Sequence, residues 1–234
     1  GDVLDYLSYD PETRAILLYM ESIPERRNFM SAARSAARNK PVLVIKAGRH
    51  PAVQSATVSH TGALAGSDDV YEAAIRRAGM LRVYDIEELF SATETLAVTN
   101  RPKGPRLAIL TNGGGIGILA VDDLLDEGGI LAELSEETMD GLSRVLSSPW
   151  SHGNPVQIHG DSDGSRYADV LGILAQAREV DGILVMHAPT CHTEPLEVAE
   201  KVVAVAKKNK RTSIMACWVG DHSVEKARAL FHQS

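Results

Sequence analysis

Short runs of aliphatic and β-branched residues alternate along the chain with longer segments whose apolar residues recur every three or four positions. The short runs predict strands at 14–20, 41–46, 81–84, 106–111, 130–134, 181–187 and 212–219. The longer segments predict helices at 3–8, 24–38, 67–78, 85–96, 116–127, 165–178, 194–208 and 222–231, and a further one beginning at Ser135. Strands separated by helical crossovers form βαβ units, so we expect an α/β protein with doubly wound, mainly parallel sheets.

One segment interrupts this alternation. Asn100 to Pro105 contains two prolines and a glycine and has no apolar periodicity, which is typical of a linker. We therefore predict two domains, at residues 1–99 and 106–234. The first begins directly in a helix and the second stops where a further strand is expected, so we expect a piece of a longer polypeptide whose first domain is incomplete at its N-terminus.

Composition and charge narrow the function classes. The chain has 234 residues, a formal net charge of −7 and 44% hydrophobic residues, which excludes intrinsic disorder. No apolar run is long enough for a membrane helix, and the two cysteines form no disulfide framework, so we expect a cytoplasmic protein that does not bind membranes. The net negative charge argues against nucleic-acid binding, and neither half of the sequence shows a basic stripe. A bound phosphate would then be held by backbone dipoles.

A glycine-rich turn follows the strand predicted at 106–111 and opens the next helix. Its candidate phosphate-binding residues are Asn112, Gly113, Gly114, Gly115, Ile116 and Gly117. Glycines here let several backbone N–H groups converge on an anion, and the helix dipole adds partial positive charge. The turn lacks the Lys of a P-loop and does not match Gly-x-Gly-x-x-Gly, so dinucleotide binding is not expected. A tight turn that needs small residues only for packing is the alternative.

A histidine lies in the loop predicted between the strand at 41–46 and the helix at 67–78. His60 is flanked by Ser59, Thr61 and Gly62, which predicts an accessible and movable side chain. A neutral imidazole is a nucleophile near neutral pH, and this suits transient phosphoryl transfer. These residues alone are also compatible with a loop histidine that is simply exposed and has no function.

The remaining reactive side chains form no known constellation. The spacing of His187, Cys191 and His192 matches no standard zinc arrangement, so we expect no metal site. Cys191 and Cys217 lack a Cys-x-x-Cys context and are interpreted as buried or incidental thiols. No Gly-x-Ser-x-Gly elbow is present, which excludes an α/β-hydrolase.

An ordered series of motifs resembles the NDP-forming acyl-CoA synthetase family, which includes succinyl-CoA synthetase and ADP-forming acetyl-CoA synthetase. The motifs are Lys40 to Arg49, Ser59 to Ser67, Ala78 to Gly79, Val83 to Leu89, Leu110 to Gly115, Leu134 to Thr138 and Asn154 to Val156. They cover nearly the whole chain. The resemblance implies two flavodoxin-like domains.

The resemblance also implies a mechanism. In that family, an acyl-CoA, phosphate and a nucleoside diphosphate are interconverted with an acid, CoA and a nucleoside triphosphate through a phosphohistidine, and the matching residue is His60. The family's carboxylate that orients this histidine matches Glu21, after Tyr19 and Met20. A carboxylate that accepts from one ring N–H leaves the other nitrogen free to attack phosphorus. The turn from Asn112 to Gly117 matches one of two helix N-termini that hold the phosphate.

The same resemblance implies that other domains are needed. A CoA-binding domain and an ATP-grasp domain, which bind CoA and Mg-ATP or Mg-ADP, are not recognisable here, so we expect no cofactor within this fragment and no turnover by it alone. Family members commonly assemble as homo- or hetero-oligomers. One departure concerns Gln157, which follows Asn154 to Val156 where the family commonly has Asp.

Two functions from different classes remain open at this stage. The first is the central part of an NDP-forming acid–CoA ligase. The second is a synthetase-like, acyl-CoA-sensing regulatory region of a protein lysine acetyltransferase, which the segments Leu81 to Asp85 and Ala216 to Gly220 also resemble. Retention of His60 favours the ligase, because the histidine is lost in some of those regulatory regions. A non-catalytic interaction module is a third interpretation.

Overall fold

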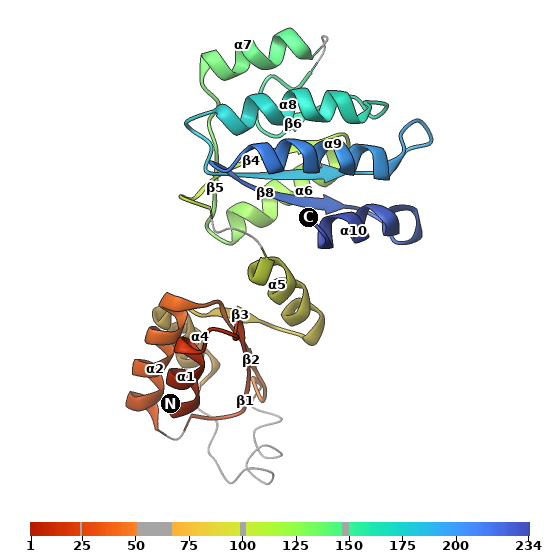
Figure 1. The fold of residues 1–234 in the computed structure, drawn as a ribbon. Helices are drawn as coiled ribbons and strands as arrows, with labels where there is room; N and C mark the ends of the chain where they lie inside the picture. Colours follow the sequence, from red (N-terminus) through yellow and green to blue (C-terminus); the bar gives the residue numbers. More distant parts are fainter. Residues whose placement is uncertain (24, 51–66, 99–101, 147–149) are drawn as a thin grey trace. The chain divides into compact units, whose positions relative to one another are not determined.

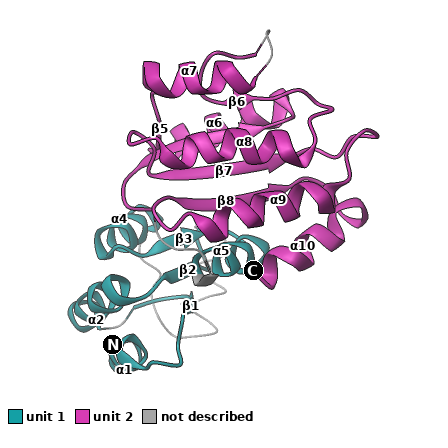
Figure 2. Cartoon of the chain, turned by 45° about the horizontal axis from the view of Figure 1, so that its top comes forward, with its two compact units in different colours: residues 1–99 teal, residues 100–234 magenta. Residues whose placement is uncertain are grey.

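The chain divides into two compact units, residues 1–99 and residues 100–234 (Figure 1, Figure 2). The computed structural model describes residues 1–234 apart from 24, 51–66, 99–101 and 147–149. Each unit contains a parallel β-sheet and its own hydrophobic core. We describe each unit by itself.

The sheet of unit 1 is built from three parallel strands in the order β1-β2-β3. They are β1 (Ile16–Met20), β2 (Val42–Lys46) and β3 (Leu81–Val83). The helices of this unit are α1 (Asp2–Tyr9), α2 (Arg26–Asn39), α4 (Asp68–Ala78) and α5 (Ile86–Val98). Every residue of β2 is buried, as expected for a central strand of a sheet that helices cover on both faces.

Small residues bring the helices of unit 1 close to its sheet. Ala32, Ala33 and Ala36 of α2 are buried against the apolar side chains of β1 and β2. Helix α4 ends at Gly79, whose φ of 78° lies in the left-handed region that favours glycine. The chain can therefore turn directly from α4 into β3.

The sheet of unit 2 has the order β5-β4-β7-β8, with β6 paired to the end of β4, and all pairs are parallel. Its strands are β4 (Arg106–Thr111), β5 (Ile130–Leu131), β6 (Val156–Gln157), β7 (Gly182–His187) and β8 (Ser213–Trp218). Its helices are α6 (Gly114–Asp126), α7 (Glu136–Val145), α8 (Gly164–Gln176), α9 (Pro195–Lys208) and α10 (Glu225–His232), and a 3₁₀ turn at His222–Val224 precedes α10.

Most of the core of unit 2 lies on one face of its sheet. Alternate residues of β4 and β7, such as Ala108 and Val185, pack there against buried side chains of α7, α8 and α9. Helix α6 lies on the opposite face of the sheet (Figure 1). Because parallel strands end at one edge, the turns after β4, β6, β7 and β8 gather at that edge, where such folds bind ligands.

The predicted α/β fold with parallel sheets is confirmed, and most elements begin and end within two residues of the predicted bounds. Two elements differ from the prediction. The short strand β6 lies in a segment predicted as loop, because two residues carry too little periodicity to mark a strand. Helix α6 begins at Gly114 instead of residue 116, since glycine has low helix propensity and conceals the true start. Among the described residues, no helix is both long and apolar enough to cross a membrane.

The expectation that neither half has a basic stripe is wrong for unit 1. Helix α2 carries Arg26, Arg27, Arg34 and Arg38, and all four line one groove. Net charge concealed this feature, because acidic residues elsewhere in the same half offset the arginines in the sum.

Candidate functional site

Glu21 follows the last residue of β1, at the carboxyl edge of the sheet in unit 1. Met20 is paired with Lys46 in the parallel register, and the carbonyl of Met20 accepts a hydrogen bond of 2.9 Å from the backbone N–H of Ala47. The ends of β1 and β2 are therefore held together. This places Glu21 beside the point where β2 leads into the segment that contains His60 in the sequence.

A buried cation lies at the same edge. Lys46 is only 3% exposed, and its ammonium donates to the carbonyl of Ala47 and lies 4.6 Å from the centre of the Tyr71 ring. Burial lowers the pKa of Lys46, and the charges of Asp68 and Glu21 partly oppose that effect. The carboxylate of Glu21 thus has a cation within electrostatic range in the part of unit 1 that the structure describes.

The start of α4 is fixed by ion pairs. The guanidinium of Arg82, on β3, donates to both carboxylate oxygens of Asp68 at 2.7 and 2.8 Å and to Glu72 at 2.9 Å. These bonds anchor the first turn of α4 to the sheet. The segment between β2 and α4 therefore has fixed ends.

His60 and its predicted neighbours Ser59, Thr61 and Gly62 lie outside the described residues. Of the two residues predicted to be catalytic, the structure consequently describes Glu21 alone. The roles of His60 and Glu21 stay predictions.

In unit 2, the glycine-rich turn joins β4 to α6 at the carboxyl edge of the sheet. Asn112 is buried, and its side-chain amide exchanges two hydrogen bonds with the backbone of Ala188, accepting from the N–H at 2.8 Å and donating to the carbonyl at 2.9 Å. The hydroxyl of Thr111 accepts from the N–H of Gly113 at 3.0 Å. The turn is thereby fixed to the loop after β7, and Asn112 acts as a structural clamp.

Three backbone donors stand at the start of α6. Gly117 donates to the carbonyl of Gly113 at 3.1 Å and makes the first intrahelical bond. The N–H groups of Gly114, Gly115 and Ile116 precede it and have no acceptor within the helix, as at every helix N-terminus. Together with the positive end of the helix dipole, they form the kind of arrangement that binds an anion.

The glycines of the turn differ in what they permit. A β-carbon at Gly117 would come within 2.8 Å of the Thr111 methyl group, and one at Gly113 within 3.1 Å of Ile116. A β-carbon at Gly117 would therefore force its surroundings to shift and one at Gly113 would be crowded, which favours the packing interpretation at these two positions. A β-carbon at Gly115 would meet no atom within 4 Å, so packing gives no reason for glycine there. A ligand at this turn would therefore not be excluded by a side chain at position 115.

Gln157 belongs to this site through a contact that sequence reasoning missed. It ends β6 opposite Thr111, and its side-chain amide atoms lie within 2.9 to 3.1 Å of where a β-carbon on Gly114 would stand. A neutral amide therefore borders the N-terminus of α6. An amide supplies N–H donors and carries no negative charge that would repel an anion.

Asn154 gives the motif from Asn154 to Val156 a structural role. Its side chain accepts from the N–H of Ile109 at 2.9 Å and donates to the carbonyls of Leu107 and Ala132 at 2.9 and 3.0 Å. The side chain thus joins the segment before β6 to β4 and to the residue after β5. The peptide bond from Asn154 to Pro155 is cis.

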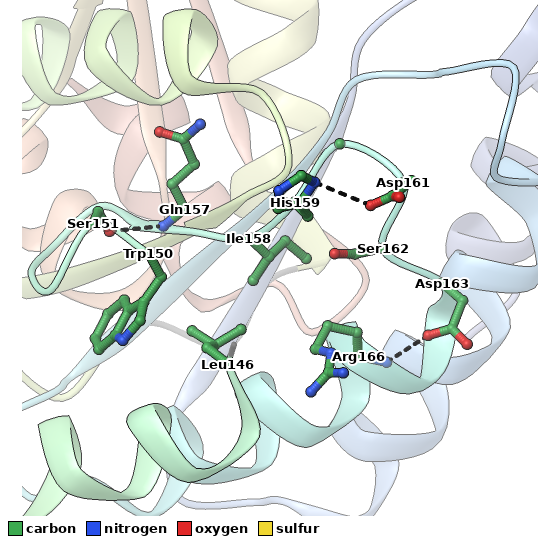
Figure 3. A pocket seen from close by; sticks show the side chains of 11 residues that line it. Leu146, Trp150, Ser151, Gln157, Ile158, His159, Asp161, Ser162, Asp163 and Arg166 are labelled. Carbon is green, nitrogen blue, oxygen red and sulfur yellow. Dashed lines mark hydrogen bonds and ion pairs between the residues drawn. The ribbon is translucent and has the colours of Figure 1, made fainter. Parts of the chain in front are cut away.

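A cavity of about 780 Å³ opens beside β6 and the N-terminus of α8 (Figure 3). Figure 3 shows Trp150, Leu146, Ile158 and Arg166 on one side of the β6 segment, whereas Gln157 points to the other side. At the rim of this cavity, the Nδ1 atom of His159 lies 3.2 Å from Oδ1 of Asp161, and both side chains are exposed. Asp163 caps α8 by accepting from the N–H of Arg166 at 2.9 Å.

The other reactive side chains of unit 2 are not gathered into a centre. His187 is fully buried, with its Nδ1 atom 3.1 Å from the Tyr167 hydroxyl, and burial lowers its pKa to about 4. Cys191 is exposed and Cys217 partly buried, and burial raises the pKa of the Cys217 thiol. Within the described ranges, no three His, Cys, Asp or Glu side chains are grouped so that they could hold a metal ion.

Family models match both units. Residues 1–96 match the succinyl-CoA ligase-like flavodoxin domain, and residues 107–234 match the ligase-CoA domain. The chain belongs to the NDP-forming acyl-CoA synthetase family. The resemblance inferred from its motifs is thereby confirmed, as is the flavodoxin-like fold.

Relatives of known activity agree with this assignment. The chain is 39% identical over 234 residues to acetate–CoA ligase [ADP-forming] I of Archaeoglobus fulgidus, covering 100% of this chain and 33% of that protein. It is 39% identical over 203 residues to the alpha subunit of acetate–CoA ligase [ADP-forming] I of Pyrococcus furiosus, covering 87% of this chain and 44% of that subunit. The chain thus spans less than half the length of these relatives.

A solved structure shows the same fold. The dinucleotide forming acetyl-coenzyme A synthetase 1 of Candidatus Korarchaeum cryptofilum, in complex with phosphate and ADP, superposes with a TM-score of 0.91 at 32% identity. The match covers 99% of this chain and 51% of that one. The family synthetase therefore has both kinds of unit in one chain.

Proposed function

We propose that this chain is the phosphoryl-relay part of an NDP-forming acid–CoA ligase. The observation that carries the proposal is the N-terminus of α6, where the N–H groups of Gly114, Gly115 and Ile116 have no acceptor within the helix. A β-carbon at Gly115 would meet no atom within 4 Å, and the neutral amide of Gln157 lies beside Gly114. This is an anion site without a lysine or arginine. The relatives named above are ligases, which favours ligation over the regulatory alternative.

In the proposed relay, a ring nitrogen of His60 attacks the phosphorus of an acyl phosphate. The N–P bond forms as the P–O bond to the acyl group breaks, and the carboxylic acid leaves as its carboxylate. An oxygen of the β-phosphate of ADP then attacks the phosphohistidine, which gives ATP and restores the imidazole. The first acyl phosphate arises when phosphate displaces CoA from an acyl-CoA.

Glu21 and the turn of unit 2 have distinct proposed roles. The carboxylate of Glu21 accepts from one ring N–H of His60, fixing the tautomer and stabilising positive charge on the phosphorylated ring. The ammonium group of Lys46 lies within electrostatic range of the Glu21 carboxylate at the same edge of the sheet. The N–H groups at the start of α6 neutralise phosphoryl charge. CoA and Mg-nucleotide are substrates that other parts of the whole protein would bind.

Labelling with ATP tests the proposal. The full-length protein is incubated with Mg²⁺ and ATP labelled on its γ-phosphate, and we expect phosphate on the protein that is labile in acid and stable in base. His60→Ala should abolish the label, whereas His192→Ala, at an exposed loop position, should retain it. Equal labelling of the wild-type protein and His60→Ala would contradict the relay.

A further inference from the structure

Helix α2 carries a charged groove that the proposed relay does not use. A cavity of about 790 Å³ runs along α2 and reaches Tyr9 of α1, and all four arginines of α2 line it. In the described part of the chain, the guanidinium groups of Arg26, Arg27, Arg34 and Arg38 have no carboxylate within ion-pair distance. Ser31 and Ser35 between them are small, so another helix could approach closely.

The placement of these arginines is unfavourable for the isolated helix. Arg26 and Arg27 occupy the first turn, where the helix dipole is positive, and that turn contains no acidic residue. Arg34 and Arg38 are four residues apart, at a spacing where like charges repel. An anionic partner at the groove would relieve both effects.

Helix α6 has the complementary pattern. The segment 107–143 contains acidic residues but no Lys or Arg, and Asp122, Asp123, Asp126 and Glu127 are all exposed. The last turn of α6 contains acidic residues where its dipole is negative, and no basic residue offsets them. Each helix therefore has, at one end, charges of the wrong sign for its own dipole.

We infer that α2 of one chain docks against α6 of a second copy, antiparallel, so that Arg26 and Arg27 meet Asp126 and Glu127. This orientation also sets the positive end of one helix dipole beside the negative end of the other. From Arg26 to Arg38 the helix rises about 18 Å, and α6 is about 20 Å long, so the two are of matching length. In a two-fold dimer, the same contact forms twice.

Exposed apolar side chains supply the non-polar part of this interface. Ile118 and Leu119 of α6 are 61% and 63% exposed, and Tyr9 beside the groove is 75% exposed. In the antiparallel arrangement, Ile118 and Leu119 stand opposite the half of α2 near Arg34. Two such contacts, each with an apolar centre and a charged rim, resemble the composition of stable protein interfaces.

Charge reversal tests the interface without unfolding either helix. Arg26→Glu with Arg27→Glu, and separately Asp126→Lys with Glu127→Lys, place favourable charges at each helix end, so neither pair should lower the melting temperature. Sedimentation equilibrium of the full-length protein at low salt should show a wild-type dimer. Each double variant should raise its dimer dissociation constant at least about tenfold. Arg76→Glu with Arg77→Glu, in the last turn of α4, is the matched control and should leave the dimer intact.

Mixing the two double variants gives the decisive result. Equimolar arginine-reversed and acid-reversed proteins should form a mixed dimer, because each of its two contacts again joins opposite charges. The variant that carries all four changes should also dimerise. A monomeric wild-type protein, or double variants as dimeric as the wild type, would overturn the inference. Rescue by the fourfold variant without rescue by the mixture would show a contact within one chain and would overturn it as well.

Discussion

Single backbone positions decide how unit 2 could hold a phosphoryl group. At the start of α6, Gly113 and Gly117 are required by close contacts, whereas Gly115 faces open space. The structure therefore separates two glycines in close packing from one, Gly115, whose β-carbon position is open. Sequence reasoning had treated the turn from Asn112 to Gly117 as one unit, because spacing alone does not show which neighbours a β-carbon would meet.

Gly115→Val should reduce turnover of the whole enzyme about tenfold, since the isopropyl group would fill open space at the helix N-terminus that is proposed to hold the phosphoryl group. The melting temperature should change little, because a β-carbon at this position would meet no atom within 4 Å. Gly172→Val is the matched control, because a β-carbon at Gly172 in α8 would also meet no atom within 4 Å. Steady-state kinetics with varied phosphate, together with thermal unfolding, make the comparison. Unchanged kinetics for Gly115→Val would remove the helix N-terminus from the mechanism.

Burial of His187 should make the stability of the protein depend on pH. Its pKa is about 4 in the folded protein, against 6.5 for a free histidine, so the unfolded chain binds the proton more readily. Protonation of the unfolded chain therefore lowers the free energy of unfolding. This loss is absent above pH 6.5 and grows as the pH falls towards 4, where it reaches about 3 kcal/mol. Urea unfolding should show that the free energy of unfolding falls less between pH 7.5 and pH 4.5 for His187→Phe than for the wild type. Equal losses would show that His187 does not titrate as its burial requires.

At the scale of elements, a cap and the hydrogen bonds around it fix the start of α7. Ser135 caps α7 by accepting from the N–H of Thr138, and Glu179 accepts from the N–H of Ser135 at 2.9 Å and the hydroxyl of Thr138 at 2.7 Å. Burial of Glu179 opposes its ionisation, but these hydrogen bonds outweigh burial and lower its pKa to about 2. The family motif from Leu134 to Thr138 is thus structural.

Glu179→Gln should lower the free energy of unfolding by about 1 to 2 kcal/mol at pH 7, because a neutral amide accepts more weakly than a carboxylate. The folded pKa lies below the value of 4.5 for a free glutamate, so this stabilisation is present above pH 4.5 and is lost as the pH falls towards 2. Denaturant titrations at pH 7 and pH 3 measure it. A difference between the two proteins that is as large at pH 3 as at pH 7 would refute the electrostatic explanation.

The sequence predicted elements with strong periodicity and missed those made by long-range contacts. Strands β2 and β7 each contain four consecutive aliphatic residues or methionine, and α8 has regular apolar spacing and an Asp cap. By contrast, β6 exists because Asn154 joins its approach to β4 and β5, a contact across more than 20 residues that no local pattern reveals. The contact of Gln157 with Gly114 and the groove along α2 are likewise products of tertiary geometry.

At the scale of the whole molecule, the proposed machinery is divided between the two units. Glu21 and Lys46 lie at the carboxyl edge of the sheet in unit 1, and the anion site lies at the corresponding edge in unit 2. Motif order in the sequence indicated this division, and the family models match each unit separately. The proposed relay would use groups of both units.

Glu21→Gln in the full-length protein should lower the amount of phosphohistidine formed from Mg-ATP at least about tenfold. The change removes the negative charge that would balance a positively charged, phosphorylated ring. Glu25→Gln, at the exposed N-cap of α2, removes one negative charge from the same unit and serves as the control. Labelling of Glu21→Gln equal to that of the control would exclude Glu21 from the relay.

The site of phosphorylation tests the central claim most directly. The full-length protein is phosphorylated with Mg-ATP, digested under alkaline conditions that preserve phosphohistidine, and mapped by mass spectrometry. The account predicts one phosphate on the peptide that contains His60, and its loss on addition of ADP. Phosphate on any other residue, or a peptide containing His60 that stays unmodified while the enzyme turns over, would contradict it.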